Sequence, residues 1–187
     1  DVSIKLSKFE TKPTQVTDDE LYALAYDKMG LVKTRHGNRL SETMLDKAIH
    51  AFAPTEDTAE TPVLLTTGTM DEDGRKKLTR LDVIALRRKL DKLKVPKKGR
   101  RLVLCSDHVA DLLEIDQKFQ NQYHDYSTGV IMKMYGFEIY EAVNCPLFDC
   151  TTKKKKSFGS VATVNDFEGS VFFYVPRMFK CKGGTKM

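Results

Sequence analysis

The sequence predicts an α+β fold, and the stretch between residues 79 and 146 carries most of that prediction. Thr79 and Asp82 have the spacing of a capping box, and apolar residues then recur three or four positions apart, as on one face of a helix. Residues 102–105 form a short continuous apolar run, which is typical of a strand buried on both faces. Residues 129–136 and 137–143 follow as a predicted strand pair.

Clear sequence signals separate these elements. Val95-Pro96 ends the first helix, because a proline disfavours the helical conformation of the residue before it. Ser106 and Asp107 can cap a second helix, whose apolar positions extend to residue 113. A polar loop over residues 117–128 then leads to the strand pair. The predicted order is therefore helix, strand, helix, loop and strand pair.

The N-terminal part predicts one strand and two helices. Residues 2–6 alternate apolar and polar side chains, as in a half-buried strand. Residues 17–20 form a second capping box, before a short helix that we expect to break at Gly30. A longer helix is predicted over residues 32–52, about 30 Å in length. One face of it carries the apolar residues Leu40, Met44, Leu45, Ala48, Ile49 and Phe52.

The remaining segments predict further strands. Residues 62–67 have the composition of a strand, and residues 71–74 that of a turn. Residues 160–164 and 170–175 are separated by a spacing that suits a β-hairpin with a longer turn.

Taken in order, these segments resemble the major capsid proteins of tailed phages, which are double-stranded DNA bacteriophages or prophages. The likeness is carried by residues 80–87, by the pattern Val95-Pro96-x-x-Gly99-Arg100-x-Leu102-Val103-Leu104, and by residues 136–141 leading to Asn144-Cys145-Pro146. Residues 9–17, 26–28 and 47–54 are similar to that family too. The resemblance covers most of residues 2–146.

The resemblance implies the tailed-phage major capsid protein fold in three parts. Residues 1–16 would be the remnant of an extended loop that lies on the adjacent subunit; the alternative is an edge strand of the chain's own sheet. Residues 17–78 would form the peripheral domain with its spine helix. Residues 79–187 would form the axial domain, a central mixed sheet flanked by helices. Because family chains carry an N-terminal arm before this region and a further strand after it, we expect a piece of a longer coat protein.

The function implied by the resemblance is mechanical. Copies of the chain would form the pentamers and hexamers of an icosahedral shell in the virion, assembled in the host bacterial cytoplasm. Packaged double-stranded DNA, bound nonspecifically, and scaffolding and portal proteins would be further partners, with no membrane partner and no cofactor. The candidate subunit-interface residues are Ile4, Leu6, Phe9, Arg35 and Arg39.

Charge is distributed very unevenly along the chain, whose net charge is +5. Residues 75–101 contain 13 Lys and Arg against two Asp, and residues 153–187 contain eight against two acids. Such a basic band favours a polyanion or acidic patches on a neighbouring copy, although a solvated helix face and loop tip would show the same pattern. The candidate polyanion-facing residues are Arg75, Lys76, Lys77, Lys97, Lys98, Arg100, Lys153, Lys154, Lys155 and Lys156. A basic nucleic-acid-binding module, acting alone or as a dimer, is the alternative function.

Candidate catalytic and metal-binding residues are few, so we expect no enzyme. Cys105 and His108 could form a thiol and base, but a cysteine that ends an apolar strand is usually a small core residue. Cys145, Cys150, His124 and Cys181 lack the close pairs typical of zinc sites. Residues 71–74 lack the distal Glu of a calcium loop. No apolar run has the length of a membrane span.

Overall fold

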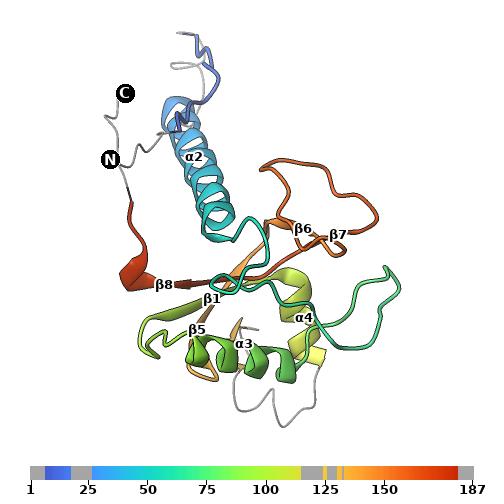
Figure 1. Ribbon diagram of the computed structural model, residues 1–187. Helices are drawn as coiled ribbons and strands as arrows, with labels where there is room; N and C mark the ends of the chain where they lie inside the picture. Colours follow the sequence, from blue (N-terminus) through green and yellow to red (C-terminus); the bar gives the residue numbers. More distant parts are fainter. Residues whose placement is uncertain (1–6, 18–26, 115–123, 126–129, 132, 181–187) are drawn as a thin grey trace. The chain divides into compact units, whose positions relative to one another are not determined.

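The computed structural model describes residues 7–17, 27–114, 124–125, 130–131 and 133–180 (Figure 1). The chain divides into two compact units, residues 1–48 with 179–187 and residues 49–178. The division falls within helix α2 (Lys28–Phe52). The predicted parts 1–16, 17–78 and 79–187 are defined by their roles in a shell, and they remain a prediction.

The larger unit is built on a four-stranded mixed sheet with the strand order β4-β5-β1-β8 (Figure 1). β1 (Arg100–Cys105) pairs in parallel with β5 (Phe137–Ala142) and antiparallel with β8 (Val171–Tyr174). β4 (Lys133–Met134) adds to β5 through a tight turn at Tyr135 and Gly136, whose φ angles of 49° and 87° are those of a type I′ hairpin. The mixed α+β architecture is confirmed.

Both faces of this sheet are covered, as the apolar run of β1 predicts. Leu102 and Leu104 pack in a cluster with residues of α3 (Arg80–Lys92) and α4 (Ser106–Glu114). Val103, one position between them, packs with Ile49 and Ala53 on the other face. Each fully buried Leu or Val side chain stabilises the fold by about 1.5–3 kcal/mol, so these two clusters fix the position of β1.

Helix α3 begins and ends with well-defined caps. Thr79 and Asp82 make the predicted capping box, in which each side chain accepts a hydrogen bond from the other residue's backbone N–H. At the C-terminal end, Lys94 has a left-handed φ of 55° and donates its N–H to the carbonyl of Asp91, while Val95 donates to that of Leu90. These two bonds are a Schellman motif, in which glycine usually occupies the position of Lys94.

Helix α2 is longer than predicted. It begins at Lys28 and continues through Gly30, so the predicted break at Gly30 is wrong. The Asp27 carboxylate accepts a 2.8 Å hydrogen bond from the Gly30 N–H, which satisfies a donor in the first turn. A Cβ at Gly30 would lie 2.1 Å from an oxygen of Asp27, so glycine here makes room for the cap.

The C-terminal part departs from the predicted hairpin. Residues 160–164 form no strand; β8 pairs instead with β1, and β7 (Asp166–Glu168) pairs with β6 (Leu147–Asp149). The predicted strand over residues 62–67 is also wrong, because this segment is irregular. The short 3-10 helix η1 (Val175–Arg177) follows β8, and β2 (His124–Asp125) pairs with β3 (Val130–Ile131). The strand predicted over residues 2–6, the helix start at 18–26 and most of the loop 117–128 lie outside the described residues.

Candidate interaction surfaces

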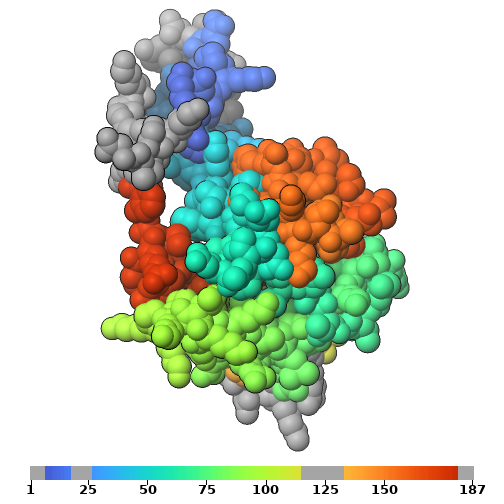
Figure 2. All heavy atoms as spheres, viewed as in Figure 1, coloured from blue at the N-terminus to red at the C-terminus, as the bar shows by residue number. Residues whose placement is uncertain are grey.

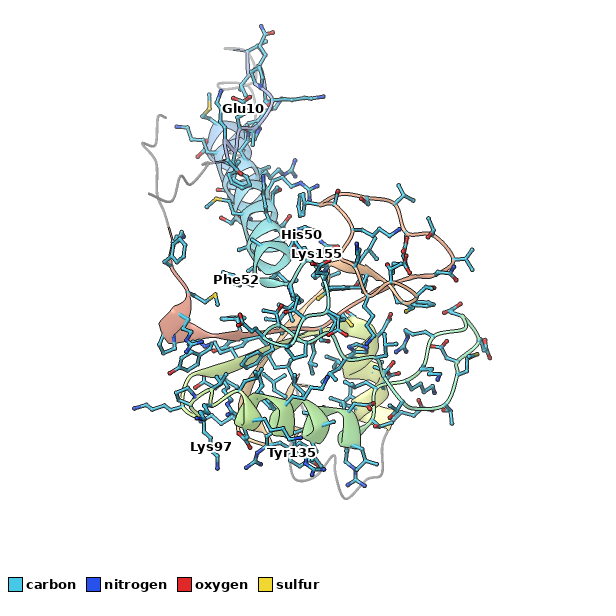
Figure 3. The ribbon with its side chains drawn as sticks, in the orientation of Figure 1. Glu10, His50, Phe52, Lys97, Tyr135 and Lys155 are labelled. Carbon is cyan, nitrogen blue, oxygen red and sulfur yellow. The ribbon has the colours of Figure 1, made fainter. Side chains whose placement is uncertain are left out.

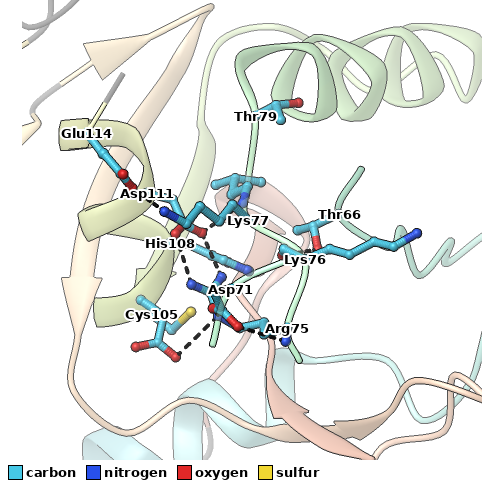
Figure 4. A network of polar contacts seen from close by, with 12 residues as sticks. Thr66, Asp71, Arg75, Lys76, Lys77, Thr79, Cys105, His108, Asp111 and Glu114 are labelled. Carbon is cyan, nitrogen blue, oxygen red and sulfur yellow. Dashed lines mark hydrogen bonds and ion pairs between the residues drawn. The ribbon is translucent and has the colours of Figure 1, made fainter. Parts of the chain in front are cut away.

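Arg75 is held inside a network of carboxylates (Figure 4). Its guanidinium donates to both oxygens of Asp111, at 2.6 and 2.9 Å, and lies 3.1 Å from the carboxylate of Asp71. Asp111 also accepts the N–H of Leu78 at 2.7 Å. The side chains of Arg75 and Asp111 are 13% and 4% exposed. Arg75 therefore supports the fold, and the structure contradicts the prediction that it faces a polyanion.

The same network shifts the pKa values of its members. The hydrogen bond to Asp111 raises the pKa of Arg75 above its ordinary value. Burial alone would raise the pKa of Asp111, but the hydrogen bonds from Arg75 and from the Leu78 N–H outweigh it, so the carboxyl pKa is lowered. Lys77, another predicted polyanion-facing residue, makes a 2.5 Å ion pair with Glu114. Its pKa is raised by that hydrogen bond.

Arg100 is buried, with 2% of its surface exposed. Its guanidinium donates to Asp91 at 2.7 Å and to the backbone carbonyls of Val95 and Pro96. These contacts fix the turn between α3 and β1, so the guanidinium is not available to a partner. The prediction that Arg100 faces a polyanion is wrong, because its charge is used to satisfy carbonyls and a carboxylate within the fold.

The run Lys153–Lys156 docks within its own unit and is not a solvated loop tip. Lys155 donates its ammonium to the carbonyls of His50 and Ala53, at 2.8 and 2.7 Å, where helix α2 ends. Figure 3 shows His50, Phe52 and Lys155 close together, and Figure 2 shows residues 147–168 against the surface of residues 49–66. A cation at a helix C-terminus is favourable, because the last carbonyls lack intrahelical partners.

The other three lysines of the run also have acidic partners. Lys153 pairs with Asp57 at 2.8 Å, Lys154 with Glu56 at 3.8 Å and Lys156 with Asp166 at 3.2 Å. Burial lowers the pKa of Lys155. Lys153, Lys155 and Lys156 are therefore held by contacts within the chain, whereas Lys154 stays 66% exposed and its role as a polyanion-facing residue remains a prediction.

An exposed basic surface remains on α3 and on the turn that follows it. Of the predicted residues, Lys97 and Lys98 belong to it, and Lys76 is exposed elsewhere. Figure 3 shows Lys97 pointing away from the sheet. Helical spacing of three or four residues brings further cations to the same surface. We call this set the α3 basic surface: Arg88, Lys89, Lys92, Lys94, Lys97 and Lys98. Four of its members, Arg88, Lys89, Lys92 and Lys94, were not among the predicted site residues, although the charge count of residues 75–101 included them.

The predicted interface residues of the smaller unit are in part on its surface. Arg35 and Arg39 are exposed, and Arg39 pairs with Glu42 at 3.4 Å. Phe9 is half-buried, with the ammonium of Lys47 lying 5.3 Å from its ring centroid. Ile4 and Leu6 lie outside the described residues. Whether these side chains contact a neighbouring subunit stays a prediction.

Much of the apolar face predicted for α2 is exposed. Met44 and Leu45 are 42% and 59% exposed, and Leu31 is 40% exposed, whereas Ile49 near the end of the helix is buried. Large apolar side chains left on one face of a long helix are typical of a surface that contacts another protein. Leu31, Met44 and Leu45 are therefore further candidates for a contact with a neighbouring subunit, beside Arg35 and Arg39.

Cys105 and His108 both contact the hydroxyl of Ser170, which donates to the Cys105 thiol at 3.7 Å. His108 Nδ1 is 2.7 Å from the hydroxyl of Ser170, which also accepts the Cys105 N–H at 3.1 Å. Burial raises the pKa of the Cys105 thiol and lowers the pKa of His108, so both groups are neutral near pH 7. Cys105 and Cys150 are free thiols, and the described part of the chain brings together no group of three or more metal-ligating side chains. Of the predicted zinc ligands, Cys181 and the side chain of His124 lie outside that part.

A cavity of about 920 Å³ opens in the larger unit between α3, the sheet and residues 60–66. Its wall is mainly apolar, including Val83, Leu86 and Leu102. Two of the titratable residues in the wall have structural partners: Asp82 accepts hydrogen bonds from Thr67 and Thr79, and Arg75 binds Asp111. The wall therefore offers apolar packing surface and does not assemble these groups for acid–base chemistry.

Comparison with known proteins gives a likeness to a solved capsid structure. No family model matches the sequence, and no curated protein matches it. Among solved structures, a chain in the capsid structure of the cyanophage P-SCSP1u superposes with a TM-score of 0.50 at 14% sequence identity, over 91% of this chain. The fold is phage capsid-like. This chain spans 65% of the length of that capsid chain. Among the helices of the described residues, none combines the length and apolarity required to cross a membrane.

Proposed function

We propose that this chain is a structural subunit of a phage capsid, and specifically a tailed-phage major capsid protein. Its copies would self-assemble into a closed icosahedral shell around double-stranded DNA. The observation that carries this proposal is the capsid-like fold over 91% of the chain. It is supported by the sequence resemblance, which rests on different evidence: the order of short motifs between residues 9 and 146.

The chemistry of the described side chains also supports a mechanical role. The thiol and imidazole that could have formed a catalytic pair are buried and neutral, and the half-buried Arg75 and the buried Arg100 are anchored to carboxylates and carbonyls. What the chain leaves exposed is contact surface, namely the apolar face of α2 and the α3 basic surface. A structural subunit needs such surfaces to contact its neighbours.

The chain spans 65% of the length of the matching capsid chain, so we propose the role and the partners of the whole protein and do not read them from the likeness. The proposed partners are further copies in pentamers and hexamers, packaged DNA bound nonspecifically, and scaffolding and portal proteins. The proposed location is the virion, after assembly in the host bacterial cytoplasm. The three predicted parts of the chain are likewise proposed as the extended-loop remnant, peripheral domain and axial domain of a coat subunit.

The direct test is the assembly state of the purified chain at moderate salt. Size-exclusion chromatography with light scattering, followed by negative-stain imaging, should show pentamers, hexamers or shells. The variant Leu45→Glu should lose these assemblies while keeping its helical circular dichroism, because it places a charge on the exposed apolar face of α2. Lys133→Glu, an exposed charge reversal on β4, is the control and should assemble normally.

Two results would contradict parts of this proposal. A chain that remains monomeric at all concentrations, and that shifts short duplex DNA with a steep dependence on salt, would replace the capsid proposal with the nucleic-acid-binding module. Assembly that is unaffected by Leu45→Glu would show that the apolar face of α2 is not a subunit contact but would leave the capsid proposal standing.

A further inference from the structure

We propose that the α3 basic surface of one copy binds the acidic turn of the next copy, residues 71–73, in a head-to-tail contact. This inference rests on the proposed function, because it names the surfaces through which copies would associate. It commits to a second copy of this chain as the partner, and binding of DNA to the same basic surface is one of the outcomes of the test.

The acidic turn is exposed and negatively charged. It lies in a short hairpin-like segment closed by the bridge between Met70 and Lys76. Glu72 and Asp73 are exposed at its tip, and Asp107, with 61% of its side chain exposed, lies 3.9 Å from Arg75. Arg75 is neutralised by its carboxylate partners, and Lys77 pairs with Glu114. Among the described residues, the exposed carboxylates Glu72, Asp73 and Asp107 therefore face only two exposed cations at this end of the unit, Lys76 and Arg80.

The acidic turn and the α3 basic surface lie toward opposite ends of one helix. The acidic turn precedes the N-terminus of α3, and the lysines at 94, 97 and 98 follow its C-terminus. A helix of 13 residues is about 20 Å long. Figure 1 shows the two turns on opposite sides of the larger unit. One copy can therefore present its basic end to the acidic end of a second while its own acidic end receives a third.

Each of the two turns is anchored by the hydrogen bonds of an arginine. Arg75 anchors the acidic turn through Asp111, and Asp71 accepts the N–H groups of Asp73 and Arg75 within it. Arg100 anchors the basic turn through Asp91 and two carbonyls, and the Gly99 carbonyl accepts the Val175 N–H. Charges presented on ordered turns lose little conformational entropy on binding, which favours a specific contact.

The placement of charge favours a second copy over DNA. DNA would use the basic surface alone and would be repelled by the acidic turn if it lay along α3. A head-to-tail contact uses both surfaces in every copy, and it generates a ring when the rotation between copies closes. Charge complementarity of this kind sets partner choice and register and weakens as salt is added.

The test uses two charge-reversed variants of the full chain. The first carries Lys94→Glu, Lys97→Glu and Lys98→Glu, and the second carries Glu72→Lys and Asp73→Lys. All five positions are exposed, so both variants should keep the circular dichroism of the wild type. Each variant alone should need at least a tenfold higher concentration to assemble, because every head-to-tail contact is repulsive. Lys133→Glu, an exposed reversal on β4, is the control and should assemble as the wild type does.

An equimolar mixture of the two variants is the decisive sample. Every contact between unlike variants restores opposite charges, so the mixture should assemble near the wild-type concentration, with differently tagged variants alternating and copurifying. Wild-type assembly combined with unchanged assembly of each variant alone would overturn this contact and leave the capsid proposal intact. The contact would also be overturned if the mixture did not regain assembly and the first variant alone had lost DNA binding and nothing else. That result would assign the α3 basic surface to DNA. A wild type that never assembles would overturn both proposals.

Discussion

Arg75 and Asp111 form a bidentate ion pair between the acidic turn and α4, with N–O distances of 2.6 and 2.9 Å. The two residues are 36 positions apart, and the carboxylate is 4% exposed. This pair joins the turn that precedes α3 to the helix that follows β1. It explains why an arginine in a basic band does not face a partner.

The Asp111→Asn variant should destabilise the protein by about 3 kcal/mol, because it leaves a largely buried guanidinium without its charged partner. Urea unfolding followed by circular dichroism measures the change. Lys77→Ala removes the neighbouring, more exposed pair with Glu114 and should have a much smaller effect. Equal effects of the two variants would show that burial does not distinguish the two pairs.

Asp111 should also make the free energy of unfolding depend on pH in the acid range. Its pKa in the folded state lies below the ordinary value of 3.8, so its contribution is complete above about pH 4 and is lost as the pH falls through the folded pKa. Relative to wild type, Asp111→Asn should therefore show a flatter stability profile below pH 4. Parallel profiles for the two proteins would contradict the lowered pKa.

His108 should make the free energy of unfolding depend on pH in a second, higher pH range. Burial lowers its pKa below the ordinary value of 6.5, so the unfolded chain binds the proton first as the pH falls. Stability should decrease as the pH drops below about 6.5, and it should level off once the folded state also titrates. His108→Gln should remove this slope; a variant that keeps it would assign the slope to another group.

Lys155→Ala should destabilise the end of α2 by about 1–2 kcal/mol, because the carbonyls of His50 and Ala53 lose a charged donor. Hydrogen exchange at residues 49–53 should accelerate along with the loss in global stability. Lys154→Ala is the matched control, since its pair with Glu56 is long and exposed and should contribute almost nothing. Faster exchange in the control would contradict the special role of Lys155.

The sequence predicted those elements whose signals are local. The capping box at Thr79 and Asp82, the buried strand β1 and the start of α4 at Ser106 all follow from neighbouring residues, and the structure confirms them. The partner of β8 could not be predicted in this way. Its choice of β1, some 70 positions earlier, depends on packing of the whole sheet, whereas a hairpin with residues 160–164 looked favourable locally.

The same limit applies to the candidate surfaces. The sequence of a lysine run does not indicate which groups its ammonium groups contact. The acceptors of Lys155 lie more than 100 positions away in the chain. Apolar character was also a poor guide to burial in the loop before β7, where Val161 and Val164 are 89% and 91% exposed. Only the three-dimensional fold separates the structural Arg75 and Arg100 from the exposed Lys97 and Lys98.

Self-association is the central claim, and sedimentation velocity over a range of protein concentrations tests it most directly. We expect the mass-weighted sedimentation coefficient to rise with concentration toward that of a defined closed ring or shell, without added DNA. A sedimentation coefficient that stays at the value for a single 21.3 kDa chain at every concentration, and that changes only when duplex DNA is added, would contradict it.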